Sequence, residues 1–188
     1  MTRSSNIDET RDRDELLAVR CQLGERDAFD DLIARWHGPL WSFVRRLTGD
    51  DDLAHDTLQD TWLRVLRGIA SLREGARLRA WLFGIARRAV MDRLREKYRE
   101  AHIVDEDVEA QAAAEEAWPS QQDLDAVQDQ LERLPFAERE LLTLFYLREL
   151  SLAELAEVLA VPLGTVKSRL FRARALMRAQ LTAQGVDG

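Results

Sequence analysis

The stretch Leu150–Ala179, LSLAELAEVLAVPLGTVKSRLFRARALMRA, decides the fold of the C-terminal part of the chain. Ser151 and Glu154 have the spacing of a capping box, in which each side chain bonds a free backbone amide of the first helical turn. Apolar residues then recur at helical spacing up to Leu159. Pro162 breaks this pattern and is suited to the first turn of a new helix. The sequence therefore predicts two helices joined by a tight turn.

The second of these helices has an apolar side and a basic side. Its inward stripe repeats at intervals of four, three and four residues, at Val166, Leu170, Ala173 and Met177. Residues 163–179 contain five basic residues and no acid, and Ser168, Phe171 and Arg172 fall on the far side. This is typical of a DNA-binding helix-turn-helix. A bundle helix with a solvated basic face is the alternative, which the agreement of cap, turn and stripe disfavours.

Charge is distributed unevenly along the chain. The net charge of the 188 residues is −7, yet residues 62–99 carry 11 basic and 3 acidic side chains. Residues 100–120 contain seven acids and no Lys or Arg. Positive charge is thus concentrated in residues 62–99 and in the last helix, which indicates a bipartite contact with a polyanion.

The composition argues against several classes of site. Cys21 is the only cysteine, so no disulfide framework or cysteine zinc site can form within one chain. Three scattered histidines do not suggest a metal site, and we expect no metal, cofactor or catalytic residue. No apolar run approaches membrane-spanning length, and the acidic start does not resemble a signal peptide. We therefore expect a cytoplasmic protein with no membrane insertion.

Two helices are predicted in the N-terminal third of the chain. Residues 1–8 are polar and are expected to be frayed, with helical patterning from about Arg13. A second helix is predicted after Gly24, with an interruption or kink at residues 37–39, His-Gly-Pro, and an end at Gly49.

A third helix is predicted from the acidic run at residues 50–52, whose charge favours a helix start, to about Arg67. Its inward stripe consists of Ala54, Leu58, Thr61 and Val65. The opposite side carries Asp56, Gln59, Asp60 and Leu63. An outward leucine among acids fits a partner-docking face and a solvated acidic face equally well.

A fourth helix is predicted from about Arg77 to Arg99, after a loop that contains Arg73. Its inward residues are Leu78, Trp81, Leu82, Ile85 and Ala89. The remainder is crowded with basic side chains, which include Arg79, Arg87, Arg88 and Arg95. Aromatic residues beside arginines suit single-stranded DNA, whose bases can stack on them. The alternative places Trp81 and Phe83 in the core, and we favour the core for Trp81.

No segment shows strand-like alternation, so the predicted class is all-α: two small helical domains joined by a flexible acidic linker. The predicted domains are residues 10–99 and 123–184, with the linker at 100–122. In the second domain, a helix from Asp123 ends at Pro135, and a helix at Glu138–Leu147 packs under the helix-turn-helix.

Two separated stretches resemble the extracytoplasmic-function (ECF) sigma factors, the bacterial subunits that direct RNA polymerase to promoters. The run LPFAERELLTLFYLRELSLAELAEVLAVPLGTVKSRLFRAR resembles the family's fourth conserved region. AFDDLIARWHGPLWSFVRRLTGD, the helix that follows it, and LRAWLFGIARRAVMDRLR resemble the second region, in order and spacing. The resemblance covers roughly four fifths of the chain, and both regions in order are far more specific than either alone.

The resemblance implies roles for matched positions. Asp56, Gln59, Asp60 and Leu63 would dock on the coiled coil of the polymerase β′ subunit. The segment from Ser71 to Arg95, with Arg73, Arg79, Arg87, Arg88 and Arg95, would read and hold the melted −10 element of the promoter DNA. Lys167, Ser168, Phe171 and Arg172 would face bases of the −35 element, while Thr165 and Arg169 fit phosphate contacts. An anti-sigma factor is common in the family and is expected as a further partner.

The chain departs from the family pattern at three places. Asn is frequent where Arg88 stands, Gly is usual where Ala160 stands, and a glycine is usual near Glu149. Two other functions fit parts of the sequence less well. A dimeric operator-binding regulator would leave the basic stretch of residues 62–99 unexplained, and a nuclease with aspartate metal ligands from residues 50–60 would lack a second acidic cluster.

Overall fold

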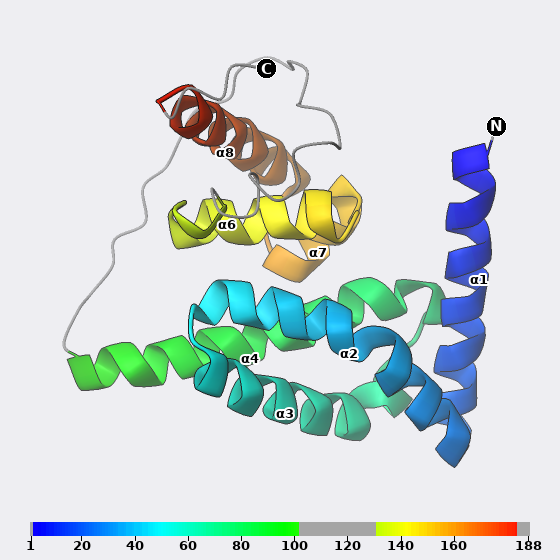
Figure 1. The fold of residues 1–188 in the computed structure, drawn as a ribbon. Helices are drawn as coiled ribbons and strands as arrows, with labels where there is room; N and C mark the ends of the chain where they lie inside the picture. Colours follow the sequence, from blue (N-terminus) through cyan, green and yellow to red (C-terminus); the bar gives the residue numbers. More distant parts are fainter. Residues whose placement is uncertain (1, 102–130, 184–188) are drawn as a thin grey trace. The chain divides into compact units, whose positions relative to one another are not determined.

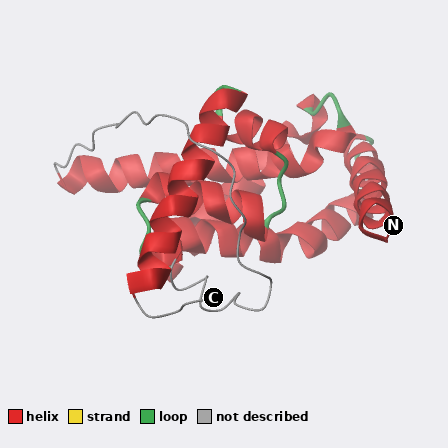
Figure 2. Ribbon diagram, turned by 90° about the horizontal axis from the view of Figure 1, so that it is seen from above, coloured by secondary structure: helices red, strands yellow, loops and turns green. Residues whose placement is uncertain are grey.

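The computed structural model describes residues 2–101 and 131–183, and every regular element within these ranges is a helix (Figures 1 and 2). The chain divides into two compact units, Met1–Ala101 and His102–Gly188. The predicted all-α class is confirmed. Most of the predicted acidic linker and of the helix expected from Asp123 lie outside the described residues.

The first helix, α1, spans Thr2–Gln22. The helix therefore begins well before Arg13, where helical patterning was expected to start. This segment contains neither Gly nor Pro, so nothing in it breaks a helix, but its start lacks the apolar stripe on which the prediction depended.

The second helix, α2, spans Arg26–Thr48 without interruption and contains Pro39. The predicted interruption at residues 37–39 is therefore wrong, and the alternative of a kink there stays a prediction. Proline removes one backbone hydrogen bond, which costs about 3 kcal/mol in a helix interior. Here the buried stripe continues across it, with Trp36 and Leu40 on either side, and packing against the rest of the unit offsets that cost. The helix ends as predicted at Gly49, which has a left-handed φ of 69°.

The third helix, α3, spans Asp51–Gly68 and begins as predicted, with the Asp50 side chain accepting the backbone N–H of Leu53. Two short 3-10 turns follow, η1 (Ile69–Ser71) and η2 (Gly75–Arg77). The fourth helix, α4, then spans Leu78–Ala101. The predicted inward residues of α3 are all buried.

The core of the N-terminal unit centres on Phe83 of α4. Its ring is fully buried and meets Trp36 and Phe43 edge-on, with ring centroids 6.1 and 5.3 Å apart. Trp81 is only partly buried and lies against Gly68. The interpretation that places these aromatic residues in the core thus holds most fully for Phe83, because Phe83 lies on the face of α4 that packs against α2.

The described part of the C-terminal unit begins at Leu131. Helix α6 (Phe136–Leu142) starts after Pro135 and continues as a π-helical turn, η4 (Thr143–Leu147). Then follow α7 (Leu152–Leu159) and α8 (Leu163–Ala183). Both α6 and α7 pack against α8 (Figure 1). The predicted inward stripe of α8, Val166, Leu170, Ala173 and Met177, is fully confirmed as buried.

Candidate nucleic-acid interface

The C-terminal unit contains the predicted helix-turn-helix. The capping box at the start of α7 is complete: Ser151 Oγ accepts the Glu154 backbone N–H, and Glu154 Oε2 accepts the Ser151 N–H at 2.8 Å. The turn between the helices passes through Ala160, which has a left-handed φ of 54°. The backbone N–H of Val166 donates to the carbonyl of Pro162 at 3.1 Å, so Pro162 supports the first turn of α8.

The basic and polar residues on the outer face of α8 differ in their exposure to solvent. Lys167 and Arg169 are exposed, as a surface that meets DNA requires. Thr165, Ser168 and Phe171 are half-buried, and the Ser168 hydroxyl donates to the Thr165 carbonyl at 3.0 Å. The exposed positions of this face are therefore basic, whereas the half-buried positions between them are uncharged.

Arg172, which was predicted to face bases of the −35 element, is bound to another helix of its own unit. Its Nε donates to Glu138 Oε1 of α6 at 2.8 Å, and its Nη2 contacts the same oxygen. The Glu138 side chain is only 5% exposed, whereas that of Arg172 is 32% exposed. A buried carboxylate requires a charged partner, so Arg172 anchors α8 to α6.

Arg174 is a second anchor, which the sequence did not reveal. Its Nε donates to the Tyr146 hydroxyl at 2.7 Å, and its guanidinium lies 5.6 Å from the ring centroids of Phe145 and Tyr146. Burial raises the pKa of the Tyr146 hydroxyl. In the sequence, the adjacent aromatic residues Phe145 and Tyr146 are the signal that could have suggested this contact with an arginine.

In the N-terminal unit the arginines of the predicted −10 segment differ in exposure. Arg73, in the loop between η1 and η2, is exposed, as are Arg88 and Arg95 of α4. Arg79 and Arg87 are half-buried. Arg95 forms an ion pair with Asp92 on the same helix, at 3.2 Å. The exposed members lie on the loop and along α4, so the structure does not gather all five into one cluster.

The predicted docking face of α3 exposes Asp56, Gln59 and Leu63, with Leu63 44% exposed. Leu66, three residues further on, is 56% exposed and extends the apolar part of this face. Leu66 is not among the predicted docking residues, although its three-residue spacing from Leu63 places both on one side of the helix.

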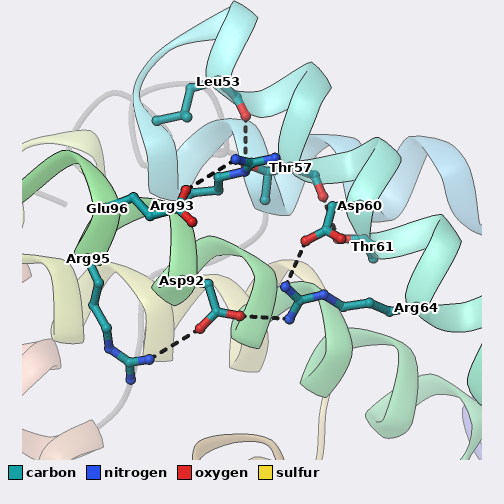
Figure 3. Close-up of polar contacts among 9 residues, drawn as sticks. All are labelled: Leu53, Thr57, Asp60, Thr61, Arg64, Asp92, Arg93, Arg95 and Glu96. Carbon is teal, nitrogen blue, oxygen red and sulfur yellow. Dashed lines mark hydrogen bonds and ion pairs between the residues drawn. The ribbon is translucent and has the colours of Figure 1, made fainter.

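Asp60, the fourth predicted docking residue, belongs to a chain of ion pairs between α3 and α4 (Figure 3). Arg64 bonds Asp60 and Asp92, each at 2.8 Å, and Asp92 also pairs with Arg95. The hydrogen bond that Arg64 donates to Asp92 raises the pKa of Arg64. Asp60 is thus half-buried and partly neutralised, and it contributes less negative charge to the face than Asp56 does.

Three of the five aspartates of residues 50–60 have structural partners. Asp50 caps α3, and that hydrogen bond from Leu53 lowers its pKa. Asp51 pairs with Arg45, and Asp60 pairs with Arg64. Across residues 2–101 and 131–183, no three His, Cys, Asp or Glu side chains are placed to hold a metal ion. The described helices also include none that is long and apolar enough to cross a membrane.

Comparisons with known proteins agree with this architecture. The family model of sigma-70 region 2 matches residues 32–100, and that of sigma-70 region 4 matches residues 124–177. The chain is 38% identical over 165 residues to the ECF RNA polymerase sigma factor SigM of Mycobacterium tuberculosis, covering 86% of this chain and 80% of that protein. It is 31% identical over 170 residues to the ECF RNA polymerase sigma factor SigW of Bacillus subtilis, covering 84% and 91%.

A solved structure is similar as well. It contains the sigma factor RpoE from Bartonella quintana in complex with the anti-sigma factor NepR. The TM-score is 0.65 at 28% identity, over 82% of this chain and 96% of that chain. With both sigma-70 regions in order and curated relatives aligned over most of their length, the chain belongs to the ECF RNA polymerase sigma factors, which direct transcription initiation and are not enzymes.

Proposed function

We propose that this sigma factor uses three surfaces to bring core RNA polymerase to its promoters: a docking face on α3, a −10 surface on the η1–η2 loop and α4, and a −35 surface on α8. The observation that carries the proposal is the presence of exposed basic side chains on one element of each compact unit, Arg88 on α4 and Lys167 on α8. Two basic elements in separate units suit two separate promoter elements.

The −35 surface comprises Thr165, Lys167, Ser168, Arg169, Phe171 and Arg172. Lys167 and Arg169 are the exposed charges of this set. A recognition helix places such side chains against base edges and phosphates of the major groove. Glu138 binds the guanidinium of Arg172, so only the exposed part of the Arg172 side chain would be available to contact DNA.

The −10 surface comprises Arg73, Arg79, Arg87, Arg88 and Arg95. Exposed arginines suit a melted strand, since a guanidinium can pair with phosphate and stack on an unpaired base. The full burial of Phe83 removes one aromatic candidate for base stacking.

The docking surface comprises Asp56, Gln59, Asp60 and Leu63, which we assign to the coiled coil of the polymerase β′ subunit. An exposed apolar residue surrounded by acids offers a small hydrophobic centre within a charged rim, a common arrangement in protein interfaces. We also propose an anti-sigma partner, because the related RpoE structure holds one, and a cytoplasmic location, where polymerase works.

Reconstitution tests the proposal. Purified core polymerase with this chain should produce run-off transcripts from a subset of genomic fragments, and neither component alone should do so. The same fragments should share two sequence elements at a constant spacing. A homodimer that protects a palindromic site without polymerase would instead identify an operator-binding regulator. Magnesium-dependent cleavage of the fragments would identify a nuclease.

A further inference from the structure

The loop between α3 and α4 packs against α1. This loop, Ile69–Arg77, consists of η1, three connecting residues and η2, and both turns pack against α1. Leu72 is buried, whereas Ser71, Arg73 and Glu74 are exposed. The loop therefore has an inner side that faces its own unit and an outer side that displays polar and charged groups.

Gln22, at the last position of α1, bonds the loop backbone twice. Its Nε2 donates to the Leu72 carbonyl at 2.6 Å and to the Ile69 carbonyl at 3.2 Å. The Leu72 N–H also donates to the Ile69 carbonyl, at 3.1 Å. One amide group thus holds both ends of the turn that precedes Arg73, across about 50 residues of sequence.

Gly75 brings the loop against α1 at a second point. A Cβ on Gly75 would lie 3.0 Å from both the Cγ and the backbone carbonyl oxygen of Glu15, closer than real Cβ atoms normally approach. Because one of these atoms belongs to the helix backbone, it cannot rotate away. A glycine permits this approach, and any other residue would push the loop outward from α1.

We infer that Gln22, together with the close approach at Gly75, positions the loop for −10 recognition, so that α1 contributes to promoter selectivity without touching DNA. The inference rests on the proposed −10 role of the loop. Gln22 lies outside residues 32–100, which match the sigma-70 region 2 model. The displacement of a guanidinium by a fraction of an ångström changes its hydrogen-bond geometry to a base, so the backbone that carries Arg73 must be held in place.

A purely structural role for Gln22 would give a different result. Loss of stability lowers the amount of active protein and reduces transcription from every promoter by the same factor. Loss of loop position changes the ranking of promoters that differ in the −10 element. Gln22 is largely exposed, so its replacement should leave the N-terminal unit folded.

The test uses reconstituted polymerase holoenzyme and a promoter library randomised at either the −10 or the −35 element, with transcripts counted by sequencing. Gln22→Met keeps the side-chain length and removes both donors, and Gly75→Ala displaces the loop independently. Leu23→Ala, at the exposed residue that directly follows α1, is the control. Arg73→Ala reports direct loss of a loop side chain.

We expect Gln22→Met and Gly75→Ala to reduce the preference among −10 sequences about threefold or more, as the loss of a hydrogen bond would predict, with −35 preference unchanged. Leu23→Ala should match the wild type. If Gln22→Met does not fold, as judged by thermal unfolding, Gly75→Ala decides the question. A uniform decrease across all −10 sequences, or no change in either variant, would overturn the inference alone. Absence of any −10 preference in the wild-type holoenzyme would overturn the proposed function, and this inference with it.

Discussion

At the scale of single residues, two positions of the C-terminal unit hold a conformation that disfavours their side chains. Glu149 and Ala160 have φ values of 52° and 54°, in the left-handed region that glycine adopts without cost. Glycine is usual in the family at or near both positions. This region costs a residue with a Cβ atom roughly 1–2 kcal/mol of conformational free energy. A substitution by glycine recovers only part of this cost, because glycine also increases the conformational entropy of the unfolded chain.

Ala160→Gly should therefore stabilise the helix-turn-helix, by about 0.5–1 kcal/mol. Hydrogen–deuterium exchange of the α7 and α8 amides in the full chain measures this change in opening free energy. Ala175→Gly, at an exposed position within α8, is the matched control and should destabilise by about 1 kcal/mol. Slower exchange for Ala175→Gly, or faster exchange for Ala160→Gly, would contradict the strain argument.

Arg172 offers a second prediction at this scale, because its ion pair with Glu138 is half-buried. Arg172→Ala leaves the Glu138 carboxylate buried without its partner, so the C-terminal unit should lose about 1–3 kcal/mol of unfolding free energy. Urea unfolding of the full chain, followed by circular dichroism, measures the loss. Unchanged stability would show that Arg172 is no anchor.

Glu138 separates the anchoring role of Arg172 from a base contact. We expect Glu138→Ala, which removes the carboxylate but no proposed DNA-binding group, to weaken −35 binding as much as Arg172→Ala if anchoring dominates. A bidentate base contact by Arg172 would add about 1–3 kcal/mol to its own loss, and only on the cognate promoter. Binding to cognate and scrambled −35 DNA, measured with the holoenzyme, distinguishes the two outcomes.

At the scale of the elements, α3 has two sides of different character. Its buried stripe supports the core, and its outer side combines exposed leucines with acids. The ion pairs of Arg64 connect this outer side to α4, so the proposed docking and −10 surfaces share one polar network (Figure 3). The pairs are substantially exposed, and such pairs contribute little to stability, about 0–1 kcal/mol each.

Leu63→Ala should weaken binding to core polymerase at least about fivefold, because a central apolar contact contributes more than about 1 kcal/mol to an interface. Leu16→Ala on α1 is the control, since Leu16 is 61% exposed in the same unit and lies outside the proposed docking face. Titration of labelled variants with core polymerase gives both affinities. Equal affinities would remove α3 as the docking element.

At the scale of the whole molecule, the two basic surfaces belong to separate compact units, and the acidic stretch at residues 100–120 lies between them in the sequence. The net charge of −7 opposes accumulation of the free chain near DNA. Polymerase would hold both units at the promoter spacing, so that the second contact becomes effectively intramolecular.

We therefore expect weak promoter binding by the free chain and strong, specific binding with core polymerase. Gel-shift titrations with the chain, the core enzyme and both together measure this at physiological salt. Insertion of residues near Ala112 should affect binding less than a change in promoter spacer length does, because the docked units set the spacing. Tight, promoter-specific binding by the free chain would contradict the proposal.

The sequence by itself determined the helical class and most helix faces. The buried stripes of α3 and α8 and the capping box of α7 follow from local spacing, which chain neighbours alone decide. The same reasoning failed at Pro39, where local preference opposes a helix that packing against α3 and α4 maintains.

Which charged and polar side chains remain available depends on the tertiary structure. Arg172 pairs with Glu138 34 residues away, Arg64 pairs with Asp92 28 residues away, and Gln22 bonds Leu72 50 residues away. Each partner is set by how two elements cross, and periodicity within one helix contains no information on that crossing. The sequence could therefore predict that α8 and α4 are basic, but it could not predict that Arg172 pairs with Glu138 of another helix in the same unit.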